Sequence, residues 1–182
     1  MDSLRREISR IVLVSGAPGA GKTTLAVPLA LELGFPLFSK DFLKETLVDV
    51  FGAEVNSLEY SRKIGSAAME LIWSLANHAP CAVIEANFRP KSDYEIRKIR
   101  GLNANLVEVH CDCGRDEAAR RFKMRAASER HHAAHPLKEL PQELLDEYDR
   151  PLNVGQLLEV DTRRPVSAQE IAHQVLAAFK TA

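Results

Sequence analysis

Hydrophobic residues in this chain occur as short continuous runs separated by longer segments of helical spacing. The runs predict strands at residues 11–14, 36–38, 81–85, 105–111 and 157–160. In the segments between them, apolar residues recur every three or four positions, which is typical of helices that bury one face. Because strand and helix alternate, the pattern predicts an α/β fold with a five-stranded parallel sheet covered by helices on both faces.

Two helices have the clearest periodicity. Leu25, Leu29 and Leu33 repeat every four residues and predict a helix after the first strand, with Pro28 inside it as the source of a kink. Apolar positions across 57–77 predict the longest helix of the chain.

Residues 128–142 lack a clear period. This stretch contains two prolines together with His131, His132 and His135, which is typical of a surface loop. We expect residues 125–141 to form a lid with few contacts to the core. A metal site on the histidines is the weaker interpretation, because no cysteine or carboxylate pattern accompanies them.

The segment after the first predicted strand matches the phosphate-binding pattern GxxxxGK(S/T). It follows an apolar run and precedes a predicted helix, which is the setting that this motif requires. Glycines let backbone N–H groups converge on a phosphate, and the helix N-terminus adds positive charge. The residues expected to bind the nucleotide are Gly16, Ala17, Pro18, Gly19, Ala20, Gly21, Lys22, Thr23 and Thr24.

The motif predicts a nucleoside triphosphate site that uses magnesium. In this pattern Lys22 reaches the β- and γ-phosphates, and the hydroxyl of Thr23 is a ligand of Mg²⁺. A glycine-rich turn that binds nothing is the alternative, and the strand and helix on either side argue against it. With the alternating elements, the motif predicts the three-layer sandwich of P-loop NTPases, as one domain over 1–182 with a helical lid.

Several classes of nucleoside triphosphatase share this motif. The chain has no Asn-Lys-x-Asp sequence of the kind that reads guanine, and at 182 residues it is too short for the accessory domains of a ring ATPase. Its third predicted strand ends in Glu85, where a Walker B motif commonly has aspartate. A small phosphotransferase is the class that fits these features.

Two further segments bear on the class: Ser39-Lys40-Asp41-Phe42-Leu43-Lys44 and Arg120-Arg121-Phe122-Lys123-Met124-Arg125. Together with the phosphate-binding motif they resemble a group of P-loop kinases that includes polynucleotide 5′-hydroxyl kinases, zeta toxins and chloramphenicol phosphotransferase. The resemblance covers most of the chain and implies an adenylate-kinase-like single domain that uses ATP. It does not identify the phosphate acceptor.

Asp41 is the candidate catalytic residue. It follows the short second strand, so we expect it at the carboxyl edge of the sheet, where ligands bind in open α/β folds. A carboxylate there accepts or orients the proton of the acceptor hydroxyl, a role that the resemblance also implies. The alternative is that Asp41 is only the N-cap of a helix over 42–51.

Lys44, one turn further on, matches a basic position that contacts substrate in the resembling polynucleotide kinases. The alternative is a solvated lysine.

Asn87 and Arg89 directly follow the third predicted strand and belong to the same edge of the sheet. We expect them to bind oxygen atoms of the substrate. Glu85, within the strand, is a candidate to orient a water molecule bound to Mg²⁺. The alternative for all three is that they satisfy local backbone groups.

Positive charge gathers between residues 115 and 130. This stretch has six basic residues and three acidic ones in a chain that is otherwise close to neutral. Arg121 and Arg125 lie four apart on one helix face, so both guanidinium groups are expected to contact the triphosphate and stabilise the transferring phosphoryl group. A solvated basic helix is the alternative, and Arg120 points to another face as a structural residue.

Composition limits the partners. Lys plus Arg is 24 and Asp plus Glu is 25, and the net charge of -1 argues against a protein that coats nucleic acid. The first apolar run is far shorter than a signal-peptide core or the roughly 20 residues of a membrane span, so we expect a cytoplasmic protein with no membrane partner. Cys81, Cys111 and Cys113 lie in or beside strand-like runs, and we expect reduced, mostly buried thiols.

These features favour an ATP- and Mg²⁺-dependent kinase that phosphorylates a hydroxyl of a small molecule by in-line transfer. A kinase for polynucleotide 5′-hydroxyls or nucleotide-sugars is the nearest alternative, and the lack of an interleaved basic and aromatic groove lowers the nucleic-acid version. An alternative of another class is a nucleotide-binding switch without phosphotransfer.

Overall fold

A parallel sheet organises the chain, of which the computed structural model describes residues 8–52, 57–128, 131–148 and 150–181. Five parallel strands form the sheet in the order β2-β3-β1-β4-β5. They are β1 (Ser9–Ser15), β2 (Leu37–Ser39), β3 (Cys81–Glu85), β4 (Ala104–Asp112) and β5 (Gln156–Asp161). All five predicted strands are confirmed, each within a few residues of its expected bounds.

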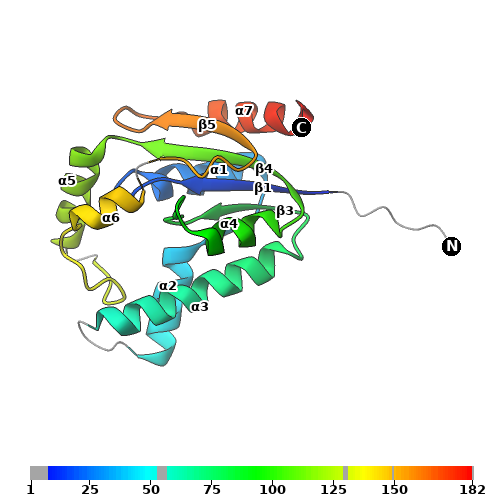
Figure 1. Cartoon of the computed structure of the whole chain (residues 1–182). Coiled ribbons are helices and arrows are strands. Elements are labelled where there is room, and N and C mark those ends of the chain that lie inside the picture. Colours follow the sequence, from blue (N-terminus) through cyan, green and yellow to red (C-terminus); the bar gives the residue numbers. More distant parts are fainter. Residues whose placement is uncertain (1–7, 53–56, 129–130, 149, 182) are drawn as a thin grey trace.

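Helices cover both faces of this sheet (Figure 1). They are α1 (Lys22–Leu33), α2 (Lys40–Phe51), α3 (Leu58–Ala76), α4 (Asp93–Arg100), α5 (Arg115–Ala126), α6 (Gln142–Glu147) and α7 (Ala168–Thr181). The helices α4 and α6 were not predicted from the sequence. Within the described residues, none of the helices combines the length and the apolar character that crossing a membrane requires.

Side chains of neighbouring residues in β1 point to opposite faces and build two core clusters. Val12 belongs to the cluster that contains Leu29 of α1 and Val175 of α7. Leu13 belongs to the cluster that contains Ile72 of α3. Full burial of an aliphatic side chain of this size stabilises the fold by about 1.5–3 kcal/mol. The three-layer α/β architecture is therefore confirmed.

The order of the strands creates a place for a ligand. β1 lies in the middle of the sheet, between β3 and β4, and the chain fills one side of it with β2 and β3 before it fills the other with β4 and β5. Open α/β sheets bind ligands at such a switch point, beyond the carboxyl ends of the strands. The segments that follow β1, β2 and β3 meet at this edge.

The segment 131–141 packs more tightly than the sequence suggested. Ala134 is buried with Val48 of α2 and Ile64 of α3 in a small separate core. The hydroxyl of Ser61 in α3 donates to the carbonyl oxygen of Ala134 at 2.9 Å. The expectation that this part of the chain has few core contacts is therefore wrong.

The histidines of this segment also have partners. His132 Nε2 lies 3.1 Å from Asp49 Oδ1, and His135 Nε2 lies 2.8 Å from Glu45 Oε1, both in α2. In the part of the chain that the structure describes, no three His, Cys, Asp or Glu side chains are grouped so as to hold a metal ion. His132 and His135 hold the segment against α2, and all three histidines are only partly exposed, which corrects the expectation of a histidine-rich surface.

Candidate active site

The phosphate-binding loop connects β1 to the first turn of α1. Gly16, Gly19 and Gly21 have φ angles of 129°, 87° and 85°, in the left-handed region that favours glycine. A Cβ atom at Gly16 would lie 2.2 Å from the carbonyl oxygen of Cys111, and one at Gly19 would lie 2.2 Å from that of Ala118. Both positions exclude a side chain, and the loop is held closely against β4 and α5.

Lys22 is enclosed by this loop. It is 6% exposed, and its Nζ atom donates to the carbonyl oxygen of Ala17 at 2.8 Å. Burial lowers the pKa of Lys22, and the charges of Glu85 and Asp41 act in the opposite direction. The ammonium group therefore lies where a bound phosphate would accept its hydrogen bonds.

Three side chains from different elements meet beside the loop. The Oγ1 atom of Thr23 in α1 donates to Glu85 Oε1 at 3.3 Å, and the Oγ atom of Ser39 in β2 donates to Glu85 Oε2 at 2.6 Å. Glu85 is 3% exposed. Mg²⁺ prefers oxygen ligands, and beside nucleotide phosphates it takes one or two carboxylates and keeps several waters. The residues present fit Mg²⁺, with Thr23 and Glu85 as the groups that would hold it.

Two cavities open at this edge of the sheet. The phosphate cavity, of about 200 Å³, is formed by the phosphate-binding loop together with Glu85 and Arg121. The large cavity, of about 930 Å³, is lined by α2, α3, α6 and the segment 131–141. The residues that line both cavities are Pro18, Asp41, Asn87 and Arg125. A small molecule in the large cavity would meet a bound phosphate at these residues.

Asp41 is not a helix cap. The N-cap residue of α2 is Ser39, and no side-chain hydrogen bond caps this helix end. Asp41 instead lies in the first helical turn, is partly buried, and lines both cavities. Its carboxylate forms no hydrogen bond or ion pair with any residue that the structure describes. The cap interpretation is therefore wrong, and the carboxylate is open to a ligand.

Lys44 is buried, so the alternative of a solvated lysine is wrong as well. It is 8% exposed, and its Nζ atom donates to Ser61 Oγ at 2.8 Å. Burial lowers the pKa of Lys44 and that of Lys40, and the charge of Asp41 acts in the opposite direction on both. Both lysines line the large cavity.

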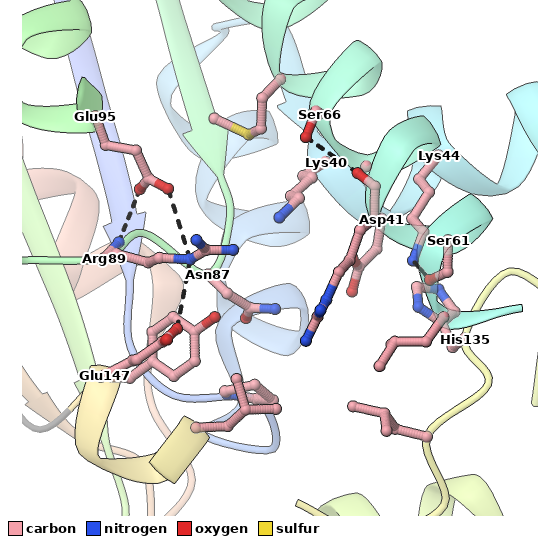
Figure 2. Close-up of a pocket in the computed structure, with 18 of the residues that line it drawn as sticks. Lys40, Asp41, Lys44, Ser61, Ser66, Asn87, Arg89, Glu95, His135 and Glu147 are labelled. Atoms are coloured by element: carbon pink, nitrogen blue, oxygen red, sulfur yellow. Dashed lines mark hydrogen bonds and ion pairs between the residues drawn. The ribbon is translucent and has the colours of Figure 1, made fainter. Parts of the chain in front are cut away.

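Charged side chains lie on two sides of the large cavity (Figure 2). On one side Arg89 Nε lies 3.9 Å from Glu95 Oε1 and 3.5 Å from Glu147 Oε2. On the other side Lys44 lies against Ser61, and Asn87 lies between the two groups. Arg89 is thus already paired with carboxylates, whereas Asn87 is open to both cavities.

Two arginines of α5, Arg121 and Arg125, line the phosphate cavity, and their contact with a triphosphate stays a prediction. Arg121 Nε donates to Glu117 Oε1 at 2.6 Å, and its two terminal nitrogens donate to the carbonyl oxygen of Thr162 at 3.2 Å. Arg125 is exposed and reaches the junction of the two cavities. Arg120 forms an ion pair with Glu117 at 2.7 Å and lines neither cavity, as expected for a structural residue.

A buried polar network lies at the end of β1, where the phosphate-binding loop begins. Glu108 in β4 is 0% exposed and accepts hydrogen bonds from Ser15 Oγ at 2.6 Å, from the backbone of Leu152 at 2.8 Å and from that of Asn153 at 2.9 Å. The Nδ1 atom of His110 lies 2.9 Å from Ser15 Oγ. Because Ser15 is the last residue of β1, this network fixes the point at which the phosphate-binding loop begins.

Sequence reasoning missed several side chains of the site: Ser39, Lys40, Ser61 and Trp73. Trp73 is 2% exposed in the wall of the large cavity, and its indole nitrogen has no hydrogen-bond partner among the described residues. A buried donor without an acceptor costs about 1–3 kcal/mol. The position of Ser39 at a strand end was a usable signal, because polar residues at that edge face ligands.

Comparison with known proteins identifies the fold. No protein-family model and no curated protein matches the chain. Among solved structures, a protein of Chloroflexus aurantiacus regarded as a kinase is 26% identical, with 94% of this chain and 99% of that chain covered and a TM-score of 0.81. The chain is thus similar over 94% of its length to a protein of about the same length.

More distant structures agree on the architecture. A sugar kinase from Janibacter is 17% identical, with 96% of each chain covered and a TM-score of 0.64. The APS kinase of Mycobacterium tuberculosis, solved with AMPPNP and APS, is 18% identical, with coverage of 95% and 98% and a TM-score of 0.59. The chain therefore has the fold of the small P-loop kinases.

Proposed function

We propose that the protein is a kinase that transfers the γ-phosphoryl group of ATP to a hydroxyl of a small molecule. The observation that carries this proposal is the position of Asp41, whose unpaired carboxylate lines both the phosphate cavity and the large cavity. A kinase needs a base where acceptor and triphosphate meet, and the position of Asp41 supports that role. Neighbours of this fold include kinases for sugars and for APS.

Each proposed role belongs to a group at the site. Lys22, Arg121 and Arg125 line the phosphate cavity and would neutralise charge on the transferring group. When bound beside Thr23 and Glu85, Mg²⁺ supplies further charge neutralisation on the phosphates. The resemblance to the kinases that include zeta toxins supports ATP as the donor.

In the proposed reaction the acceptor oxygen attacks the γ-phosphorus from the large cavity. The hydroxyl proton passes to Asp41, a new P–O bond forms to the acceptor, and the bond to the β-phosphate oxygen breaks. The products are the phosphorylated acceptor and ADP, and the proton leaves Asp41 for solvent. Asn87, which lines both cavities, is suited to donate to an oxygen of the acceptor.

The test is a screen of small hydroxyl compounds and 5′-hydroxyl oligonucleotides for uptake of phosphate from γ-labelled ATP. We expect transfer to a small molecule that depends on Mg²⁺ and is lost in Lys22→Ala. Tight ATP binding with no transfer to any class of acceptor would favour the nucleotide-binding switch. Transfer confined to oligonucleotides or nucleotide-sugars would favour that kinase branch instead.

A further inference from the structure

Two lysines of α2, Lys40 and Lys44, line the large cavity, and no carboxylate of the described residues is in contact with either. Lys44 Nζ has the hydroxyl of Ser61 as its hydrogen-bond partner at 2.8 Å. Lys40 forms no hydrogen bond or ion pair with any residue in the described ranges. Both stems cross Gly65 of α3, since a Cβ atom there would lie 3.7 Å from Lys40 Cε and 3.8 Å from Lys44 Cε.

The carboxylates of the cavity are occupied elsewhere, with the exception of Asp41. Glu95 and Glu147 lie against Arg89, across the cavity from Lys44 in Figure 2. Glu70 is bonded at 2.7 Å to Lys98, which does not line the cavity. The lysine pair is therefore left with Asp41 as its nearest unpaired acid.

This arrangement does not stabilise the fold. Burial lowers the pKa of Lys44, and the positive charge of Lys40 lowers it further, while the charge of Asp41 opposes both. Cations taken out of water without an acid in contact are costly, and two of them at one place repel each other. An anion from outside the chain would supply the missing partner.

We infer that the acceptor carries an anionic group, a carboxylate or a phosphate, which binds between Lys40 and Lys44 while its hydroxyl lies at Asp41. This inference rests on the proposed kinase function and names the substrate class. Asp41 and Lys44 are three residues apart, about 5 Å along the helix axis, so the anion and the reacting hydroxyl belong to one small molecule. Hydroxy acids and sugar phosphates have this separation of groups.

The experiment compares matched acceptors with wild type and with the double variant Lys40→Met/Lys44→Met. Each neutral polyol or sugar is paired with its carboxylate and its phosphate, and a 5′-hydroxyl dinucleotide is included. Methionine keeps the length of the apolar stem and removes the charge. We expect wild type to prefer the anionic members, and the double variant to raise their KM about ten- to a hundredfold with little change for neutral ones. The carboxylate and phosphate arms show which anion is bound.

A matched control is Lys63→Met, which removes an exposed lysine of α3 that lines neither cavity. It should leave KM for every acceptor unchanged. Thermal unfolding should show the double variant at least as stable as wild type, because a costly charge pair is gone.

Three outcomes would overturn the inference. Equal transfer to neutral and anionic acceptors, unaffected by the double substitution, would overturn the anionic acceptor and leave the kinase intact. Preference for the dinucleotide would point to nucleic acid. Calorimetric binding of the anions that depends on both lysines, with no transfer from ATP, would keep an anion site and overturn the kinase instead.

Discussion

The hydroxyl of Thr23, in the first turn of α1, donates to the carboxylate of Glu85, the last residue of β3, at 3.3 Å. The same carboxylate accepts a 2.6 Å hydrogen bond from Ser39, the last residue of β2. Glu85 therefore ties the phosphate-binding loop to the strand that precedes Asp41. Its position beside the loop holds these elements together, and when Mg²⁺ binds there the same carboxylate would be one of its ligands.

Glu85→Gln separates these two roles. The amide keeps the size of the side chain and an acceptor oxygen but removes the charge that attracts Mg²⁺. We expect the Mg²⁺ concentration for half-maximal activity to rise about tenfold or more, a change of about 1.4 kcal/mol in metal binding. Titration of activity with MgCl₂ measures it. Ser39→Ala serves as the control, since it removes a hydrogen bond without changing charge, and an equal shift there would speak against a metal role for Glu85.

Lys22→Ala should weaken ATP binding without unfolding the protein. The ammonium group is buried, and among the described residues it is bonded only to a backbone carbonyl, so its removal costs the fold little. A charged hydrogen bond to phosphate contributes about 1.5–3 kcal/mol. Calorimetric titration should show a loss of affinity of about ten- to a hundredfold. An unchanged affinity would remove Lys22 from the nucleotide site.

Glu108→Ala should strongly destabilise the fold. Its side chain accepts three hydrogen bonds in a fully buried position, and the alanine variant leaves those donors unsatisfied. Loss of one member of such a network costs about 3–5 kcal/mol. Chemical denaturation measures the change, and Glu32→Ala, an exposed carboxylate of α1, should alter stability by less than about 0.5 kcal/mol. Similar values for both variants would show that the network contributes little.

Acid should destabilise the fold through His110. Burial lowers the pKa of His110 below its ordinary value of 6.5, although the nearby charge of Glu108 acts in the opposite direction. Below pH 6.5 the unfolded chain then binds more protons than the fold, so stability is present above that pH and is lost as the pH falls through it. The denaturation midpoint should drop between about pH 7.5 and about pH 5.5, and drop less in His110→Asn.

Burial lowers the pKa of His135 as well, but wild type and His110→Asn both retain this histidine. The difference between the two pH profiles therefore isolates His110. Superimposable profiles would mean that His110 titrates in the fold as it does in the unfolded chain.

Much of the fold followed from local patterns, and what escaped has physical reasons. The strands of the sheet are nearly continuous apolar runs because both faces are covered. By contrast, α4 has only eight residues, with Ile96 and Ile99 as its two aliphatic positions, and α6 has only six residues. Neither helix is long enough for a repeat of apolar positions to stand out in the sequence. Short or solvated helices are held by their surroundings more than by their own sequence.

Some residues of the candidate site could likewise be predicted from local patterns, and others could not. Gly16 to Thr24 form a contiguous motif, and Asp41 was placed by its position after a strand. The burial of Lys44 depends on Ser61, 17 residues away, and the packing of Ala134 depends on the same serine, 73 residues away. Contacts over such separations are set by how helices pack, which a single sequence does not encode in any local pattern.

Hydrogen exchange tests whether the segment 131–141 acts as a lid. It closes the large cavity on one side and is tied to α3 through Ser61 and to α2 through His135. We expect protection of this segment to increase with a nonhydrolysable ATP analogue, since closure excludes water from the reaction. Ser61→Ala, which breaks the tie to Ala134, should lower protection in the free protein. Equal exchange with and without the analogue would exclude a lid.

The most direct test of the account is the turnover of Asp41→Asn on a confirmed acceptor. Asparagine keeps the shape of the side chain but cannot take the proton of the hydroxyl, and general-base assistance is worth about two to four powers of ten in rate. Because Asp41 makes no structural hydrogen bond or ion pair with the described residues, folding and ATP affinity should persist. We expect a fall in kcat of at least about a hundredfold at unchanged ATP affinity, whereas near-wild-type turnover would contradict a catalytic role for Asp41.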